Sequence, residues 1–209
     1  MLDRPLLLAT RNQGKISEFE KLLSGFDIEI KNLKDFGNIP TIIEDGKTFD
    51  DNAYKKAHFT AKALGFPALS DDSGLMVEAL GGDPGVRSAR YSGERATDED
   101  NNRKLLKAME EVTDRKAMFM CVIIIAVPRG PALTYEGRCE GEIAWEPQGE
   151  NGFGYDPVFY YPPVKKTFAQ ISQEQKNRIS HRGKAMAELR SEFDKVLIWL
   201  DHRLSDEPF

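Results

Sequence analysis

The sequence is poor in the residues from which disulfide and zinc sites are built. It contains two cysteines and three histidines in 209 residues. Cys121 and Cys139 lie in strand-like segments without a C-x-x-C spacing, so we expect reduced, structural thiols. His58 and His202 fall on the surfaces of expected helices, which leaves too few ligands for a zinc cluster.

Long apolar runs and an excess of positive charge are also lacking. The longest apolar run, 118–127, is about half as long as a membrane-spanning helix requires, and Met1–Pro5 leads directly into a short apolar strand rather than a signal sequence. We therefore expect a cytoplasmic protein with no membrane partner. The formal net charge of −5 disfavours a nucleic-acid partner, although a pocket that gathers a few cations or a divalent metal can still bind a polyanion.

The composition that remains is that of a globular protein, long enough for one substantial core or two closely packed lobes. Strands and helices alternate at first and a hairpin follows, so we predict one α/β domain over residues 1–209, built on a mixed sheet. The expected strands cover 5–10, 28–33, 67–70, 116–127 and 132–146, and the expected helices cover 15–24, 48–65, 97–112 and 183–204. Thr48 and Thr97 are expected to cap the starts of their helices, and Gly65 is expected to end the first of these. Residues 75–96 read as loops or short strands. Residues 149–163 read as irregular, and Pro162-Pro163 argues against a helix there.

The stretch Thr10-Arg11-Asn12-Gln13-Gly14-Lys15 joins an apolar run to a run with helical spacing. Such a strand-to-helix turn directs free backbone N–H groups and the positive end of a helix dipole at one place, which suits a phosphate. Lys15 adds a full positive charge. A polar loop before an ordinary helix is the alternative, and the Walker pattern G-x-x-x-x-G-K-[ST] is absent.

Carboxylates gather in two further segments. Asp71-Asp72-Ser73-Gly74 follows a short buried strand, and carboxylates at a strand end are the oxygen ligands that Mg²⁺ takes together with substrate phosphates. The alternative is a solvated acidic turn or a helix cap. Glu44-Asp45-Gly46 is a weaker signal, because acidic turns before helices are common.

Two segments near the C-terminus could recognise a planar base. In 149–157, three glycines stand beside Phe153 and Tyr155, so the backbone can approach a ligand closely while a ring stacks on it. Lys176 and the segment 180–184 supply cations, and Arg182 could donate to a carbonyl or a phosphate. The alternatives are a turn pinned by core aromatics and a basic surface turn.

Taken in order, these segments resemble the inosine triphosphate pyrophosphatase family, also called Ham1-like. The matches run from residue 10 to 184 and comprise Thr10-x-Asn12-x-x-Lys15, Glu44-x-Gly46-x-Thr48-Phe49-x-x-Asn52-Ala53, Asp71-Asp72-Ser73-Gly74-Leu75, Gly81-Gly82-x-Pro84-Gly85-Val86-x-Ser88-Ala89-Arg90-Tyr91, Gly152-Phe153-Gly154-Tyr155-Asp156-Pro157-x-Phe159 and Ser180-His181-Arg182-Gly183. Each motif is modest alone, but six in this order are highly specific.

The resemblance implies an elongated mixed sheet flanked by helices in two lobes, with the active-site cleft between them, and a homodimer. It implies Mg²⁺-dependent hydrolysis of purine nucleoside triphosphates such as ITP, dITP, XTP and dXTP to the monophosphate and pyrophosphate. By the resemblance, Glu44 and Asp72 hold the metal, and Asp72 and Lys15 are catalytic. The residues implied to bind substrate are Thr10, Arg11, Asn12, Gln13, Gly14, Lys15, Ser73, Phe153, Gly154, Tyr155, Asp156, Lys176, His181 and Arg182.

One departure from the family pattern is Arg11, where many members carry a small residue. It could add a cation beside the phosphates or point into solvent. Other functions also stay open: a pyrophosphatase for modified pyrimidines, a nucleotide sensor without turnover and, least favoured, a nucleic-acid-binding protein.

Overall fold

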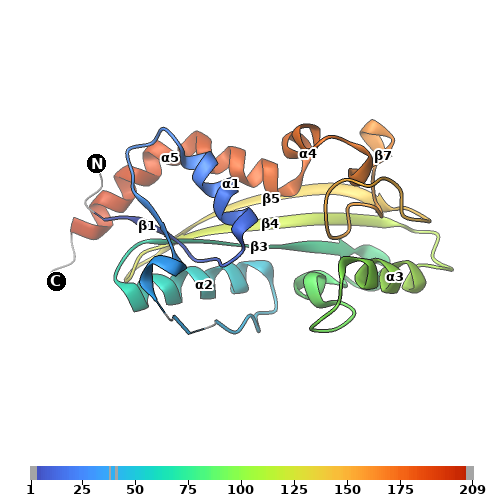
Figure 1. The fold of residues 1–209 in the computed structure, drawn as a ribbon, viewed down its shortest axis with the longest axis horizontal. Coiled ribbons are helices and arrows are strands. Elements are labelled where there is room, and N and C mark those ends of the chain that lie inside the picture. Colours follow the sequence, from blue (N-terminus) through green and yellow to red (C-terminus); the bar gives the residue numbers. More distant parts are fainter. Residues whose placement is uncertain (1–3, 38, 41, 206–209) are drawn as a thin grey trace. The chain divides into compact units, whose positions relative to one another are not determined.

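The computed structural model describes residues 4–37, 39–40 and 42–205, so Met1–Asp3, used above to argue against a signal sequence, lies outside it (Figure 1). Its strands form one sheet in the order β2-β1-β3-β4-β5-β6-β7. β1 pairs in parallel with β2 and β3, whereas β6 pairs antiparallel with β5 and β7. The predicted α/β class with a mixed sheet is therefore confirmed. The strands are β1 Leu6–Leu8, β2 Ile30–Asn32, β3 Ala68–Val77, β4 Lys116–Ala126, β5 Ala132–Ile143, β6 Phe159–Tyr161 and β7 Lys166–Thr167.

The chain divides into two compact units. The first unit contains residues 1–72, 122–135 and 185–209, and the second contains 73–121 and 136–184. β3, β4 and β5 each contribute residues to both units. In the part of the chain that the structure describes, no helix is long and apolar enough to cross a membrane.

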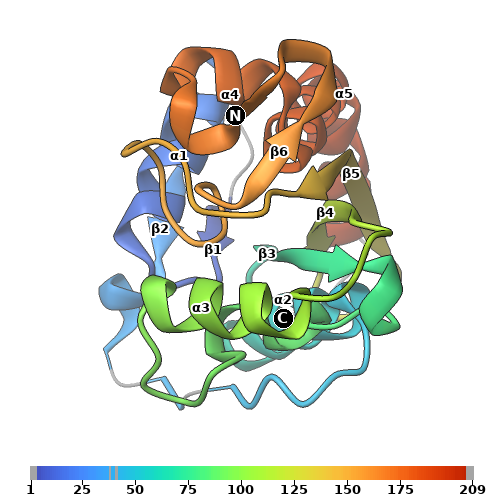
Figure 2. The same cartoon turned by 90° about the vertical axis from the view of Figure 1, so that its right-hand side faces the viewer.

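The first unit packs helices on both faces of its strands. α1 (Gln13–Leu23) and the long α5 (His181–Ser205) lie on one side, and α2 (Phe49–Leu64) lies on the other (Figures 1 and 2). α5 contributes a stripe of buried side chains at three- and four-residue spacing, as its periodicity predicts. The stripe comprises Ala185, Leu189, Phe193, Val196, Leu200 and Leu204.

The second unit contains α3 (Asp98–Ala108) and α4 (Gln173–Ile179) and has an aromatic core. The ring of Phe159 lies 4.6 Å from that of Phe119 and 4.8 Å from that of Phe168, measured between centroids. Short 3₁₀ turns connect the elements of this unit at Glu78–Leu80, Gly85–Arg90, Pro162–Val164 and Phe168–Gln170. Both cysteines are buried thiols outside any disulfide among the described residues, as expected.

The helix ends follow their local signals closely. Thr48 Oγ1 accepts the N–H of Asp51 at 3.0 Å, and the Asp51 carboxylate accepts the N–H of Thr48 in return. Gly65 ends α2 in the left-handed conformation at φ +73°, which glycine adopts without steric cost. Thr97 caps α3 in the same way as Thr48 caps α2, but α3 ends at Ala108 rather than at 112.

Several other features of local structure differ from the predictions. β3 continues past the expected end at Ser70 to Val77, because the later strand residues Leu75 and Val77 are also buried. The segment 149–163 contains β6, and a 3₁₀ turn begins at Pro162, where a missing N–H does no harm. α4 was not foreseen, since seven mostly polar residues give no clear period. α5 begins at His181, two residues before the predicted start.

Candidate active site

The turn Thr10–Lys15 forms the N-terminus of α1, as predicted. Asn12 is the N-cap: its side-chain oxygen accepts the N–H of Lys15 at 3.1 Å, and its own N–H donates to Thr10 Oγ1 at 3.2 Å. Gln13 accepts from the ammonium of Lys34 at 3.0 Å. Asn12 is therefore held by hydrogen bonds at the helix start. The turn itself is exposed and lies at the positive end of an eleven-residue helix.

Two cations of this turn are bound to other parts of the first unit. Lys15 Nζ lies 2.8 Å from the carboxylate of Asp71, whose side chain is fully buried. Lys15 therefore connects the turn to β3. Arg11 donates to the carbonyl of Ile39 at 2.6 Å. The side chain that departs from the family pattern thus holds the backbone near residue 39 by a hydrogen bond.

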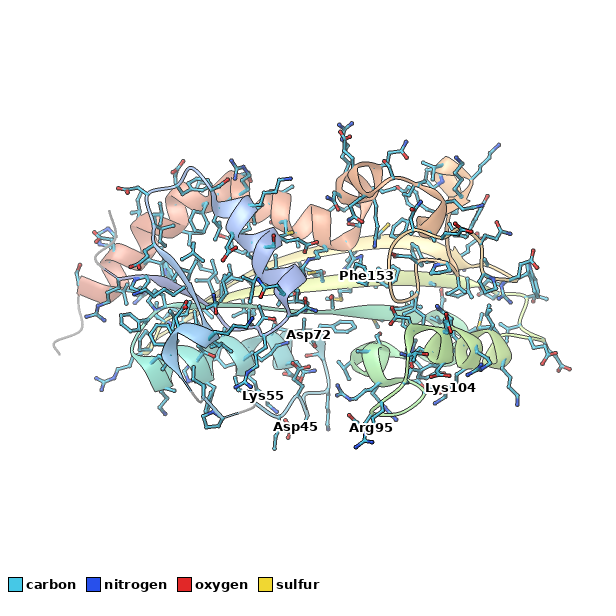
Figure 3. The ribbon with its side chains drawn as sticks, viewed as in Figure 1. Asp45, Lys55, Asp72, Arg95, Lys104 and Phe153 are labelled. Atoms are coloured by element: carbon cyan, nitrogen blue, oxygen red, sulfur yellow. The ribbon has the colours of Figure 1, made fainter. Side chains whose placement is uncertain are left out.

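Glu44 and Asp72 share one cationic neighbour. The ammonium of Lys56, on α2, lies 2.9 Å from Glu44 Oε1 and 3.9 Å from Asp72 Oδ1. Its side chain is only 13% exposed, so the attraction is weakly screened by water. The structure therefore brings these two predicted metal ligands around a single positive charge. By contrast, the neighbouring pair of Asp45 and Lys55 lies at the surface (Figure 3).

The environment of Asp72 stabilises its protonated form relative to that of a free aspartate. Burial raises the pKa of the Asp72 carboxyl and outweighs the opposing charge of Lys56 and the hydrogen bond from Asn52, while nearby Glu44 raises it further. That hydrogen bond, from Asn52 Nδ2 to Asp72 Oδ2, is 3.1 Å long. A carboxylate with a raised pKa is a stronger base than an ordinary aspartate.

The loop 152–156 of the second unit presents an aromatic ring to solvent on a backbone held by hydrogen bonds. The Phe153 side chain is 68% exposed, while Tyr155 and Asp156 are buried. Asp156 Oδ2 accepts the N–H of Phe153 at 2.9 Å, and the Tyr155 hydroxyl donates to the carbonyl of Ser88 at 2.9 Å. Gly152 is required here, because a Cβ at this position would lie 2.0 Å from Asp156 Oδ2.

Lys176 connects this loop to α4. Its ammonium lies 2.5 Å from Asp156 Oδ2 and 4.3 Å from the centroid of the Phe153 ring. Both charged side chains are almost completely buried. Burial raises the pKa of Asp156 despite the attraction of Lys176. Burial likewise raises the pKa of Tyr155 and keeps its hydroxyl protonated.

The remaining predicted residues of the second unit come from α5 and β3. His181 and Arg182 lie in the first turn of α5 and are half-buried. The His181 ring stacks on Phe119 with centroids 4.6 Å apart and planes inclined by 11°, so its orientation is fixed by the core. Ser73 is half-buried on β3, directly after Asp72.

Lys56 and the side-chain role of Asn52 were missed at the level of sequence. Both lie on α2, one turn apart, and both contact Asp72. A signal was present, because a wholly buried asparagine within the alanine-rich stripe of an amphipathic helix requires a polar partner. The partner itself could be known only after β3 was placed beside α2.

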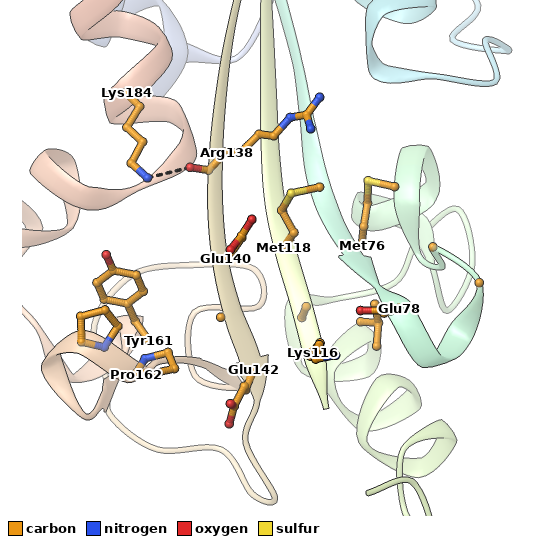
Figure 4. Close-up of a pocket in the computed structure, with 16 residues that line it drawn as sticks. Met76, Glu78, Lys116, Met118, Arg138, Glu140, Glu142, Tyr161, Pro162 and Lys184 are labelled. Atoms are coloured by element: carbon orange, nitrogen blue, oxygen red, sulfur yellow. Dashed lines mark hydrogen bonds between the residues drawn. The ribbon is translucent and has the colours of Figure 1, made fainter. Parts of the chain in front are cut away.

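The second unit also contains an open hollow of about 1010 Å³ on its part of the sheet (Figure 4). None of the predicted site residues lines it. Its charged lining comprises three acidic residues, Glu78, Glu140 and Glu142, and three basic residues, Lys116, Arg138 and Lys184. Such a balance gives no net attraction for a triphosphate. Among the residues that the structure describes, no three His, Cys, Asp or Glu side chains cluster as a metal site either.

Comparison with known proteins agrees with the motif order. The profile of the Ham1 family matches residues 6–192. The chain is 59% identical to a dITP/XTP pyrophosphatase of Desulfotalea psychrophila, covering 97% of this chain and 91% of that protein. It is 58% identical to another of the same name from Syntrophobacter fumaroxidans, covering 97% and 87%.

A solved structure of a Ham1 protein from Coxiella burnetii superposes with a TM-score of 0.88 at 43% identity. The match covers 92% of this chain and 99% of that one. A Ham1 protein from Staphylococcus aureus matches at a TM-score of 0.87 and 42% identity, covering 92% and 100%. Sequence and fold agree over nearly the whole chain, and the protein therefore belongs to the Ham1 family.

Proposed function

We propose that this protein is a hydrolase that cleaves non-standard purine nucleoside triphosphates, namely ITP, dITP, XTP and dXTP, to the monophosphate and pyrophosphate. The observation that carries the proposal is the gathering of Glu44 and Asp72 around one cationic position in the unit that also holds the Lys15 turn. Relatives more than half identical to this chain are named dITP/XTP pyrophosphatases, which supports the same reaction. Removal of these nucleotides from the pool would be its cellular role.

We propose Mg²⁺ as the cofactor, held by Glu44 and Asp72. The fit rests on the donor set, because two carboxylates that already flank an ammonium carry the negative charge and the oxygen donors that another cation would need. Two protein carboxylates are typical of a magnesium site that completes its ligand shell with substrate phosphates. When bound, the ion would neutralise charge on the phosphate oxygens.

The first unit would supply the groups for the triphosphate. The N-terminal turn of α1 offers backbone N–H groups and the helix dipole, and the Thr10 hydroxyl and Lys15 ammonium lie on the same turn. Lys15 is held by buried Asp71, so its charge is already positioned before substrate arrives. Asp72, with its raised pKa, is the proposed acceptor of the proton from the attacking water.

The second unit would supply the groups for the base. The exposed ring of Phe153 offers a stacking face, and its backbone is held by Asp156. Arg182 has only N–H donors, which suit the O6 carbonyl of hypoxanthine or xanthine and reject the amino group of adenine. Guanine also carries the O6 carbonyl, so its rejection must depend on the group at C2. We assign the recognition of that group to the backbone of 153–156.

The test is pyrophosphate release from ITP, XTP, GTP, ATP and dTTP, with Mg²⁺ and with a chelator. We expect Mg²⁺-dependent cleavage of ITP and XTP and weak cleavage of the standard nucleotides. Asp72→Asn should abolish turnover, whereas Asp45→Asn should not, because Asp45 lies on the surface and pairs with exposed Lys55. Binding of ITP without turnover would instead indicate a sensor, and preferential cleavage of a pyrimidine would refute the assignment of the base.

We also propose that the protein is a homodimer, as the family resemblance implies. The sheet face around the hollow in Figure 4 carries equal numbers of acidic and basic side chains, which can pair with those of an identical copy across a twofold axis. Light scattering coupled to size-exclusion chromatography measures the mass directly. A monomer at micromolar concentration would contradict the proposal.

A further inference from the structure

Two side chains of α3 hold both polar groups of a single residue in the base-binding loop. The carboxylate of Asp98 accepts the N–H of Gly154 at 2.6 Å. The amide of Asn102 donates to the carbonyl of Gly154 at 2.9 Å. Asp98 and Asn102 lie one helical turn apart, so they face the same side of α3. All of these residues belong to the second unit.

The contact is specific to the backbone of one residue. Gly154 adopts a left-handed conformation at φ +61°, which residues with a side chain rarely take. Its two neighbours along the chain are held separately, Phe153 by Asp156 and Tyr155 by the carbonyl of Ser88. The loop is therefore held by hydrogen bonds at three consecutive residues, 153 to 155, although the ring of Phe153 itself is open to solvent.

Asn102 makes this contact at a cost to the fold. The residue is 93% buried, and within the part of the chain that the structure describes the Oδ1 atom of its amide has no hydrogen-bond partner. Leucine has almost the same shape and would remove the unpaired Oδ1, but it would leave the Gly154 carbonyl without this donor. The asparagine is therefore matched to the Gly154 carbonyl, which points to a requirement for that contact in function.

We propose that Asp98 and Asn102 are positioning residues that set the discrimination between purine bases by fixing the Gly154 peptide. The inference rests on the proposed function, in which the backbone of 153–156 meets the C2 edge of the base. Rejection of the guanine 2-amino group requires a backbone that cannot move aside. A loop released from α3 could shift to accommodate that group. Cleavage of the guanine nucleotide should therefore become more efficient relative to that of the hypoxanthine nucleotide.

Two substitutions each remove one of the contacts to Gly154. Asn102→Leu removes the hydrogen bond to the Gly154 carbonyl, and Asp98→Ala removes the acceptor for its N–H. Asp98→Asn keeps an acceptor oxygen without the charge and serves as a rescue. Glu99→Ala is the matched control, because Glu99 is an exposed carboxylate in the same first turn of α3.

The measured quantity is the ratio of kcat/KM for ITP to kcat/KM for GTP. We expect the ratio to fall by about 10-fold in Asn102→Leu and Asp98→Ala. The change should come from the KM values, while kcat for ITP stays the same. Asp98→Asn and Glu99→Ala should stay near the wild-type ratio. Hydrogen exchange at the amides of 153–155 should become faster in the first two variants only.

The failure of this inference is distinguishable from failure of the proposed function. If wild-type protein cleaves ITP but the ratio is unchanged in both Asn102→Leu and Asp98→Ala, the positioning role is wrong while the function stands. A lower melting temperature with an unchanged ratio would show that the contact is purely structural. If wild-type protein does not cleave ITP, the proposed function fails and the inference falls with it.

Discussion

Replacing Lys176 by methionine should destabilise the protein in a pH-dependent way. The ammonium of Lys176 lies 2.5 Å from Asp156 Oδ2, and the side chains are 8% and 2% exposed. Methionine keeps the packing but leaves a buried carboxylate without its countercharge. Breaking a buried ion pair on one side costs about 3–5 kcal/mol, which corresponds to a fall in Tm of about 6–20 °C for a protein of this size.

The sign of the pH dependence follows from the pKa of Asp156. Burial already raises this pKa, and Lys176 is the main group that opposes the rise, so the pKa should increase further in Lys176→Met. A carboxyl group whose pKa is higher in the folded state binds protons preferentially there. Its contribution to stability is complete below the unfolded pKa and is lost as pH rises through the folded pKa. The destabilisation relative to wild type should therefore be large near neutral pH and small in acid.

Urea unfolding at about pH 5 and about pH 8 measures this difference. The double variant Asp156→Asn/Lys176→Met should recover much of the lost stability, because it removes the unpaired carboxylate. Glu174→Gln, which breaks the exposed pair of Glu174 and Arg178 on the same helix, should leave the midpoint unchanged. A loss of stability in Lys176→Met that is equal at both pH values, or no loss at all, would refute the reasoning.

Two further predictions concern other buried groups. Lys56→Met should bind Mg²⁺ more tightly than wild type in the absence of nucleotide, because the ammonium between Glu44 and Asp72 no longer competes with the ion. Titration calorimetry measures this affinity, and an unchanged or weaker affinity would count against the proposed metal site. Burial raises the pKa of the Cys139 thiol to about 11, so a thiol reagent at about pH 8 should modify this cysteine in unfolded protein and leave it intact in the folded state, as mass spectrometry of digested peptides can establish.

Local sequence signals predicted the helix ends that depend on a few neighbouring residues. Thr48 and Gly65 delimit α2, and Thr97 begins α3, because capping requires only hydrogen bonds within one turn. The same signals did not predict where β3 ends. Its continuation to Val77 depends on contacts distant in sequence, such as the hydrogen bond from the N–H of Leu75 to Ser88 Oγ.

The motif order was sufficient for the family, and the residue types in the motifs were sufficient for the chemistry that each could perform. Hydrogen-bonding groups, charge and metal-ligating oxygens are intrinsic to the side chains of Asn12, Lys15, Glu44 and Asp72, whatever their positions in the fold. What these side chains contact could not be read from the sequence. The pairing of Lys15 with Asp71 and the direction of Arg11 toward Ile39 depend on the packing of separate elements.

The sequence by itself therefore determined the fold class, the capped helices and the family, because periodicity, capping and motif order are properties of short stretches of chain. Tertiary structure alone decided that Lys56 reaches both Glu44 and Asp72, and that Asp98 and Asn102 hold Gly154 across more than fifty residues. The physical reason is that hydrogen bonds and ion pairs act over a few ångströms, whereas these partners become neighbours only when strands and helices distant in the chain pack together.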